Sequence, residues 1–302
     1  MNLILFESDE LRAAENGGEA AAENAGETAA ENGGGTAAET LRFDGTLSRR
    51  DPRAEHLLKV LRKKEGQGFD AGLMGGSLGR GAIKKINLRG IEFSLTLEAE
   101  PPPRIPLRLG VGFPRPIQLR RLLRDCATLG LLAVDLICTE LGEKSYRDTK
   151  LLDDGGARSA LLEGIAQARD TRLPAVAVYP GLDDWLSRQP WESDPAVTGQ
   201  AAALDAALDA APDAPGNLRP AGPLLAVADN LRPRGSFAGL GPVQTGAVLA
   251  VGSERGWSSR ERESLERTGF LRLSLGPRAL RTETACVAAV ILLMEKMGAL
   301  GC

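Results

Sequence analysis

Short apolar segments alternate with helix-forming segments along the last two thirds of this 302-residue chain. Leu131–Cys138 is a mostly apolar run, which is typical of a strand buried on both faces of a parallel sheet. Pro116–Leu129 is predicted to be a helix, with proline in its first turn and Gly130 as its C-cap. Strands that alternate with helices imply a parallel sheet covered on both faces. The pattern therefore predicts an α/β domain that begins near Arg104.

The same pattern predicts the remaining elements of this domain. Ser258 and Glu261 have the spacing of a capping box, so a helix is expected to begin there and to end at Gly269. The other predicted strands are Leu107–Gly112, Val176–Tyr179, Leu224–Ala228, Ala247–Val251 and Phe270–Leu275, and the other predicted helices are Leu161–Ala168, Asp183–Arg188 and Glu283–Met297.

The region before this domain has a different pattern. Ile83–Leu88 and Ile91–Leu97 alternate between apolar and polar residues, as half-buried strands do, and many glycines punctuate residues 41–100. A small β-barrel fits these features. Pro101–Pro103 then forms a stiff linker. The predicted domains are thus 1–100 and 104–302.

Two low-complexity insertions interrupt the predicted domains. An eight-residue repeat based on Ala-Ala-Glu-Asn-Gly-Gly occupies residues 11–39, and it has almost no large apolar side chain to bury. Residues 189–222 are rich in Ala, Pro, Asp and Gly. Neither composition supports a packed core, so both are expected to be surface insertions without a fold of their own.

The net charge of −3 is the sum of two unlike parts. Residues 1–48 contain ten acids and two bases, whereas the rest of the chain contains 35 bases and 30 acids. The excess of bases falls in the barrel and in the run from Arg104 to Arg124, which contains six arginines with no acid before the last of them. Two adjoining basic runs favour a track for nucleic-acid phosphates over a merely solvated face.

Several classes of protein are disfavoured. The longest apolar run, Ala285–Met294, is about half the length needed to span a bilayer, and the N-terminal residues do not resemble a signal peptide. The four cysteines form no Cys-x-x-Cys pair, and His56 is the single histidine. We therefore expect a cytoplasmic protein without a metal site.

Two turns at predicted strand ends have the residue types of a ligand site. Val251–Trp257 contains a Gly-x-x-x-Gly turn that exposes backbone N–H groups, although a plain strand-to-helix turn would also explain it. Leu275–Ala285 leads into the last helix and has the sequence Leu-Gly-Pro-Arg-Ala-Leu-Arg-Thr-Glu-Thr-Ala. A capped helix alone does not require the two arginines, Arg278 and Arg281, or a proline beside a glycine.

Leu275–Ala285 closely resembles the signature Leu-Gly-Pro-Arg-[IV]-Leu-Arg-Thr-Glu-Thr-Ala of the RsmE family of 16S ribosomal RNA uridine N3-methyltransferases, which belong to the SPOUT superfamily. Ala250–Trp257 is similar to the family's Ile-Gly-Pro-Glu-Gly-Gly-Phe turn, and His56–Arg62 to its His-x-x-x-Val-Leu-Arg segment. Gln167, Arg172 and Pro174 occur in the order of another family stretch. The resemblance covers roughly residues 41–188 and 222–302.

The resemblance implies a PUA-like RNA-binding β-barrel followed by a trefoil-knotted α/β methyltransferase domain that binds S-adenosylmethionine. It further implies a homodimer, formed through the knotted domain with help from the apolar last helix, and 16S rRNA of the small ribosomal subunit as substrate. By matching positions, the cofactor-binding residues are Gly252, Glu254, Gly256, Leu275, Gly276, Leu280, Thr282, Thr284 and Ala285.

The resemblance also suggests roles in chemistry and in RNA binding. A sulfonium methyl is already a strong electrophile, so catalysis needs placement and a deprotonated uridine N3. Arg281 could stabilise the uridine anion, and Glu283 could anchor Arg281. The candidates for RNA binding are His56, Arg62, Arg115, Arg172 and Arg278.

Departures from the family pattern leave alternatives open. Arg255 replaces a glycine of the family turn, Ala166 replaces a glutamate and Asp170 an arginine. These changes fall on the expected substrate side, while the cofactor side matches the family. A divergent RNA-binding paralogue that has lost or changed methyl transfer, or a methyltransferase with another RNA target, therefore remains an alternative.

Overall fold

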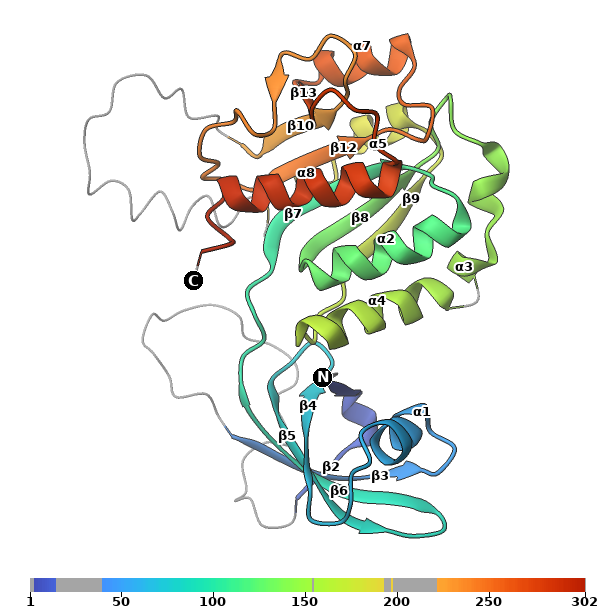
Figure 1. Ribbon diagram of the computed structural model, residues 1–302, viewed down its shortest axis with the longest axis vertical. Helices are drawn as coiled ribbons and strands as arrows, with labels where there is room; N and C mark the ends of the chain where they lie inside the picture. The colour runs from blue at the N-terminus through green and yellow to red at the C-terminus, as the bar shows by residue number, and fades with distance from the viewer. Residues whose placement is uncertain (1–2, 15–39, 154, 193–196, 198–221, 302) are drawn as a thin grey trace, which may run out of the picture. The chain divides into compact units, whose positions relative to one another are not determined.

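The computed structural model describes residues 3–14, 40–153, 155–192, 197 and 222–301 (Figure 1). The chain forms two compact units, one of Met1–Pro102 with Arg169–Arg172 and one of Pro103–Ala168 with Leu173–Cys302. Most of the two predicted insertions, 11–39 and 189–222, lies outside the described residues. The β-rich N-terminal part and the α/β C-terminal part predicted from the sequence are confirmed.

The N-terminal unit is built on a six-stranded sheet in the order β1-β4-β5-β6-β3-β2. β1 is parallel to β4, and the other neighbouring strands are antiparallel. The strands are β1 (Ile4–Phe6), β2 (Arg12–Ala13), β3 (Leu41–Ser48), β4 (Gly68–Leu73), β5 (Leu78–Ile86) and β6 (Gly90–Ala99). The short helical segments are η1 (Ser8–Glu10), α1 (Pro52–Glu55) and the π-helical turn η2 (His56–Val60).

The alternating sequence of this unit fixes which faces of its strands are buried. In β6 every second side chain from Ile91 to Leu97 is buried, as the pattern predicts. Phe6, Phe69 and Phe93 meet in the core, with the rings of Phe6 and Phe93 4.8 Å apart. Aromatic packing of this kind supplies much of the core of a small sheet.

The segment Arg169–Arg172 joins the N-terminal unit although it follows helix α4 (Gly156–Ala168) of the other unit in sequence. Thr171 is fully buried, its hydroxyl donates to Gly76 O at 2.7 Å, and its carbonyl accepts from Gly75 N at 2.9 Å. Arg169 pairs with Asp70 at 3.4 Å. The chain therefore passes through the N-terminal unit a second time.

The C-terminal unit has a seven-stranded sheet in the order β11-β13-β10-β12-β7-β8-β9, and all its paired strands are parallel. Its strands are β7 (Ile105–Gly112), β8 (Leu131–Ile137), β9 (Ala175–Tyr179), β10 (Leu224–Ala228), β11 (Gly235–Ser236), β12 (Ala247–Val251) and β13 (Leu271–Ser274). Among the described residues its helices, apart from α4, are α2 (Pro116–Thr128), η3 (Lys144–Asp148), α3 (Lys150–Asp153), α5 (Leu182–Arg188), α7 (Ser259–Arg267) and α8 (Thr282–Lys296).

Helices cover both faces of this sheet, as the alternation of elements predicts (Figure 1). α2 and α8 pack together on one face, and α5 contacts α7 on the other. The predicted capping box is present at the start of α7, where Ser258 N donates to Glu261 Oε2 at 2.8 Å and Ser258 Oγ accepts from Glu261 N at 3.1 Å. The trefoil knot implied by the family resemblance stays a prediction. None of the described helices is long and apolar enough to cross a membrane.

A buried polar cluster that the sequence did not reveal lies beside this sheet. Asp135 on β8 is fully buried and accepts from Arg108 Nη1 at 2.9 Å and from Trp185 Nε1 at 2.7 Å. Gly110 makes room for the indole, because a Cβ there would lie 2.5 Å from a ring carbon of Trp185. A buried carboxylate requires such partners. The cluster therefore ties β7, β8 and α5 together.

Candidate functional site

A pocket opens where β10, β12 and β13 end in the C-terminal unit. The carboxyl ends of parallel strands meet at one edge of a sheet, and the loops that follow them are the usual place for ligands. The pocket is lined by Ala228, Asp229, Asn230, Val251, Gly252, Ser253, Glu254, Gly256, Leu275, Arg278, Ala279, Leu280, Thr282 and Ala285.

The structure brings most of the predicted cofactor residues together around this pocket. All of them except Gly276 and Thr284 line it, although they come from two turns far apart in the sequence. Gly276 lies in the lining loop with a φ of +107°, a conformation that favours glycine. Thr284 is exposed one turn into α8. Their roles in cofactor binding stay predictions.

The turn after β12 forms one wall of the pocket. Gly256 N donates to Ser253 O at 2.8 Å, which closes a tight turn, and Gly256 has a φ of +73°. A Cβ on Gly252 would lie 2.8 Å from the carbonyl carbon of Gly256. The backbone at the two ends of the turn therefore approaches so closely that residue 252 must be glycine. The wall therefore consists largely of main chain.

Arg255, which replaces a glycine of the family turn, is exposed within this turn. The described non-glycine residues with positive φ are Arg62, Arg169, Gln189 and Arg232, so the backbone at Arg255 does not need glycine. This substitution leaves the main-chain path of the turn intact.

The loop between β13 and α8 forms the opposite wall. Gly276 N donates to Ser274 Oγ at 3.0 Å, and Ser274 Oγ is 3.2 Å from Asn230 Oδ1. Asn230 Nδ2 also donates to Arg278 O at 3.3 Å. Asn230 follows β10, so its amide fastens this loop to the neighbouring strand.

Asp229 and Asn230 are pocket residues that the sequence analysis missed. Asp229 forms an ion pair with Arg262 of α7, and its carboxylate accepts from Leu231 N at 2.9 Å. The signal available in the sequence was their place directly after the predicted strand Leu224–Ala228, since polar residues at that edge of a parallel sheet are candidates for ligand contact.

Arg281 and Glu283 lie at the start of α8, beside the pocket. Arg281 is the exposed N-cap residue, and within the described part of the chain its guanidinium has no hydrogen bond or ion pair. Glu283 is half-buried in the first turn, and no described contact joins it to Arg281. Residues two apart at a helix start face different directions, so the suggested anchoring of Arg281 by Glu283 is not seen.

Two of the predicted RNA-binding residues lie in the C-terminal unit near this site. Arg278 is exposed and lines the pocket. Arg115 is the exposed N-cap of α2, where its backbone N–H donates to Glu254 Oε1 at 3.3 Å and its Nε donates to Tyr146 Oη at 3.0 Å. Glu254 therefore links Arg115 to the pocket wall.

The other three lie in the N-terminal unit. Arg172 is half-buried, donates to Pro102 O, and lies 3.3 Å from the buried carboxylate of Asp170. His56 is half-buried in η2, and its Nε2 has no hydrogen-bond partner among the described residues. Arg62 is exposed with a φ of +52°. The partners of Arg172 and Asp170 indicate that these two residues fasten the second pass of the chain.

The arginine run from Arg104 to Arg124 does not form one continuous basic surface. The Arg104 guanidinium donates to main-chain carbonyls, among them Leu173 O at 3.1 Å, and Arg108 is in the buried cluster with Asp135. Arg120 pairs with Glu163, and Arg124 with Asp125 at 3.3 Å. Strand alternation and helix periodicity separate residues that are neighbours in the sequence. Of this run, Arg115 and Arg121 are exposed and form no ion pair within the described residues.

The pocket suits a ligand that is held by main-chain groups. Its two walls are a glycine turn and a loop with a left-handed glycine, and the charged side chains Glu254 and Arg278 lie at exposed positions. Across the described part of the chain, no group of three or more His, Cys, Asp or Glu side chains is placed to hold a metal ion.

Comparisons with known proteins agree with this arrangement. Residues 100–294 match the model of a family described as an RNA methyltransferase domain. The chain is 35% identical to ribosomal RNA small subunit methyltransferase E of Treponema pallidum over 244 residues, which cover 80% of this chain and 82% of the relative. It is 25% identical to ribosomal RNA small subunit methyltransferase E 1 of Borreliella burgdorferi, over 84% of this chain and 94% of the relative.

The fold is also shared with solved structures. The crystal structure of ribosomal RNA small subunit methyltransferase E from Neisseria gonorrhoeae bound to S-adenosyl methionine matches with a TM-score of 0.58 and 18% identity. The match covers 87% of this chain and 94% of that structure. The two proteins therefore share a fold over most of their length.

Proposed function

The chain belongs to the RsmE family of small-subunit ribosomal RNA methyltransferases, and on that basis we propose that it transfers a methyl group from S-adenosylmethionine to N3 of a uridine in 16S rRNA. The observation that supports this proposal best is the main-chain cradle at the ends of β10, β12 and β13, which residues of the family signature line. The two relatives named as ribosomal RNA small subunit methyltransferases E, which the chain matches over most of their length, support the RNA substrate.

The walls of the pocket are proposed to hold the cofactor. Backbone groups near Gly252, Gly256 and Gly276 would bind and orient it, because glycine lets a ligand approach the main chain closely. When bound, S-adenosylmethionine supplies an electrophilic sulfonium methyl. Thr282, buried at the start of α8, and Leu280 would complete the enclosure. Placement in this enclosure is a large part of what the reaction requires.

Arg281 is proposed to act on the uridine. Its guanidinium lies beside the pocket without a described internal partner, so it is available to stabilise the negative charge that develops as N3 loses its proton. Arg278 and Arg115 would contact the RNA backbone at the same edge of the sheet. Glu283 has no described contact with Arg281, so a role for it would require a direct contact with substrate.

Assembly and location follow from the family as further proposals. We propose a homodimer that buries part of α8, since Ile291 on this helix is 40% exposed. The N-terminal unit is proposed to be a PUA-like RNA-binding domain, the C-terminal unit is proposed to carry the trefoil knot, and the protein is proposed to act in the cytoplasm.

A second candidate function is an RNA-binding paralogue that binds the cofactor but does not transfer its methyl group. Ala166 and Asp170 depart from the family pattern on the expected substrate side. Asp170 is buried and accepts from Thr171 N at 2.7 Å, so this departure has a structural explanation. The methyltransferase is therefore the function that the geometry supports better.

The proposal is tested with small subunits from a strain that lacks this gene. The purified protein and S-adenosylmethionine should restore N3-methyluridine at one position of 16S rRNA, detected by mass mapping of rRNA fragments. Calorimetry with S-adenosylmethionine is run alongside. Binding of the cofactor without transfer would favour the paralogue, and unchanged N3-methyluridine in the deletion strain would contradict the proposed substrate.

A further inference from the structure

The turn between β5 and β6 in the N-terminal unit is held rigidly by its own side chains. Asn87 N donates to Gly90 O at 2.9 Å, and Asn87 Oδ1 accepts from Arg89 N at 2.8 Å and from Gly90 N at 3.0 Å. Asn87 Nδ2 in turn donates to Glu92 at 2.9 Å. Gly90 lies so close to Leu47 O that an added Cβ would be 1.9 Å from it. The turn therefore has one well-defined conformation.

This rigid turn presents a large apolar side chain to solvent. Leu88 is 93% exposed, more than any other exposed large hydrophobic residue that the structure describes. Single exposed apolar residues are common and need no explanation by themselves. Leu88 differs from most of them because its turn is held by two backbone N–H groups, of Arg89 and Gly90, that donate to Asn87 Oδ1, and because exposed arginines are close to it in the chain and in the paired segment.

The cations come from this turn and from the segment that follows β3. Arg49 N donates to Arg89 O at 3.0 Å and Arg49 Nη1 donates to Asn87 O at 3.1 Å, which ties the two segments together. Arg50 and Arg89 are exposed, and no carboxylate contacts either of them in the described part of the chain. Arg49, Arg50, Leu88 and Arg89 are called the hairpin tip below.

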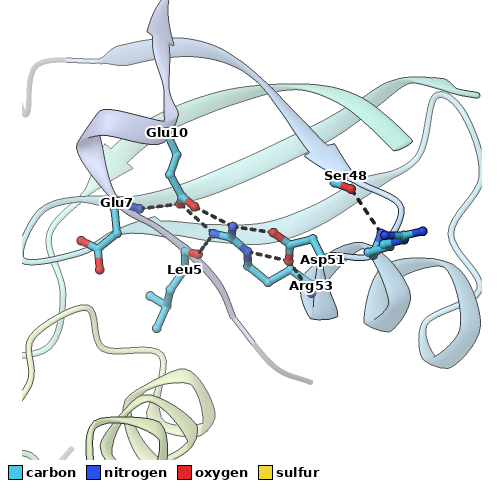
Figure 2. Close-up of polar contacts among 7 residues, drawn as sticks. Leu5, Glu7, Glu10, Ser48, Asp51 and Arg53 are labelled. Carbon is cyan, nitrogen blue, oxygen red and sulfur yellow. Dashed lines mark hydrogen bonds and ion pairs between the residues drawn. The ribbon is translucent and has the colours of Figure 1, made fainter. Parts of the chain in front are cut away.

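Carboxylates of this unit have partners other than Arg50 and Arg89. Glu92, which follows the turn in β6, accepts from Asn87 Nδ2. Figure 2 shows that Arg53 lies between Glu10 and Asp51, with N–O distances of 2.7 Å and 2.8 Å. Hydrogen bonds from Arg53 hold the pKa of both carboxyls below their ordinary values, so they stay ionised and paired. Asp44 pairs with Lys84 at 2.7 Å. Within the described residues, Arg50 and Arg89 therefore have no carboxylate in direct contact.

We propose that the hairpin tip is an RNA-binding element separate from the cofactor pocket, in which Arg50 and Arg89 bind phosphates and Leu88 packs against an unstacked base or a sugar between them. The inference rests on the proposed function for its choice of RNA as the partner. Exposed arginines without a carboxylate partner complement a polyanion. An apolar side chain held between phosphate-binding cations suits an exposed base of a single-stranded loop.

The test measures binding of 16S rRNA and of unmethylated small subunits between 50 and about 200 mM salt, a range over which phosphate contacts have a large effect. The double variant Arg50→Ala/Arg89→Ala removes two cations and leaves Arg49, which fastens the turn, in place. We expect the slope of log K against log salt to fall by roughly 1.5, because each lost phosphate contact contributes about 0.7–0.9. Leu88→Ala should weaken binding about three- to tenfold with an unchanged slope.

Matched controls come from the C-terminal unit. Arg188→Ala removes an exposed arginine that pairs with Asp184, and Val178→Ala trims a side chain that is 52% exposed. Both should leave the affinity and its salt slope unchanged. Thermal unfolding of every variant should match the wild type, since the altered side chains are exposed.

The outcomes separate this inference from the proposed function. Affinity for S-adenosylmethionine and the rate of methyl transfer at saturating RNA should be unchanged in the tip variants. Only the KM for RNA should rise. A wild-type protein that binds RNA without methylating it would end the proposed function, while the salt slopes would still test the tip. Unchanged affinity and slope in the double variant would overturn the inference. If the variants lost affinity for small subunits but not for naked rRNA, the inference would also be overturned, and a ribosomal protein would be indicated as the partner.

Discussion

The two units of this protein present their functional groups in different ways. In the N-terminal unit, strands that are mostly neighbours in sequence pair antiparallel, and charged side chains stand on the turns between them. In the C-terminal unit, strands distant in sequence lie side by side, and the pocket at their ends is walled largely by main chain. Single substitutions in the first unit should therefore cause small, graded losses of stability or binding. In the second unit, substitutions at a few positions should cause large losses.

The largest expected effect on folding is in the buried cluster of the C-terminal unit. Asp135→Ala leaves Arg108 and the Trp185 indole without their carboxylate partner, and breaking a buried pair in this way costs about 3–5 kcal/mol. Asp51→Ala in the N-terminal unit removes a helix cap and a partly exposed ion pair, for which we expect about 1 kcal/mol. Urea denaturation of the full-length variants measures both. Equal losses would contradict the proposed difference between the two units.

The next effect concerns the side chain proposed to act in the chemistry. Arg281→Ala should lower kcat about 10²- to 10³-fold, as loss of one donor to a developing anion does elsewhere. Affinity for S-adenosylmethionine should stay the same, because Arg281 is not among the residues that line the pocket. Single-turnover methylation of small subunits and calorimetry measure the two quantities. Arg255→Ala, at an exposed position of the facing turn, is the control, and full activity in Arg281→Ala would exclude the role.

A smaller effect tests the main-chain wall. Gly252→Ala places a Cβ 2.8 Å from the backbone of Gly256, so the turn after β12 must open. We expect at least a roughly tenfold loss of affinity for S-adenosylmethionine, equal to about 1.4 kcal/mol. Gly241→Ala is the matched control, because an added Cβ there meets open space. Calorimetry that finds both variants equal to the wild type would show that the main chain of this turn does not hold the cofactor.

The sequence predicted the parts of the fold whose signal is local. The alternation of Ile91–Leu97 and the capping box at Ser258 became a strand and a helix start, because each depends only on residues a few positions apart. The two glycine turns were also found, since glycine marks a backbone requirement directly. The residues that line the pocket were therefore largely predictable from two short segments.

Features that depend on distant residues were not predictable. β1 pairs in parallel with β4, the segment Arg169–Arg172 enters the N-terminal unit, and Asp135 receives its partners from positions 27 and 50 residues away. Nothing near Asp135 in the sequence distinguishes a paired buried carboxylate from one on a surface. Arg108 of β7 was grouped with the arginines of α2 for the same reason, although it is buried.

The smallest expected effect is a pH dependence in the N-terminal unit. The Arg53 guanidinium holds the pKa of Glu10 below its ordinary 4.5 and that of Asp51 below its ordinary 3.8. The unfolded chain then binds more protons than the folded one below about those values, so the stabilisation is present above them and is lost as the pH falls through the lowered folded values. Arg53→Met, which removes this cation, should cost about 1 kcal/mol at pH 7.

Wild type and Arg53→Met should therefore converge in stability as the pH falls through the lowered folded pKa values of Glu10 and Asp51, because protonation of these carboxylates releases Arg53. Urea denaturation of both from pH 7 downward measures the difference, with Arg42→Met, an exposed arginine on β3, as the control. A constant difference across this range would mean that Arg53 stabilises the unit through its packing on Phe6, where its guanidinium carbon lies 5.3 Å from the ring centre, and not through the carboxylates. The surface charges of the N-terminal unit would then contribute to ligand binding and not to stability. The C-terminal unit would differ from it in this respect, because a buried charge pair, Arg108 with Asp135, supports its sheet.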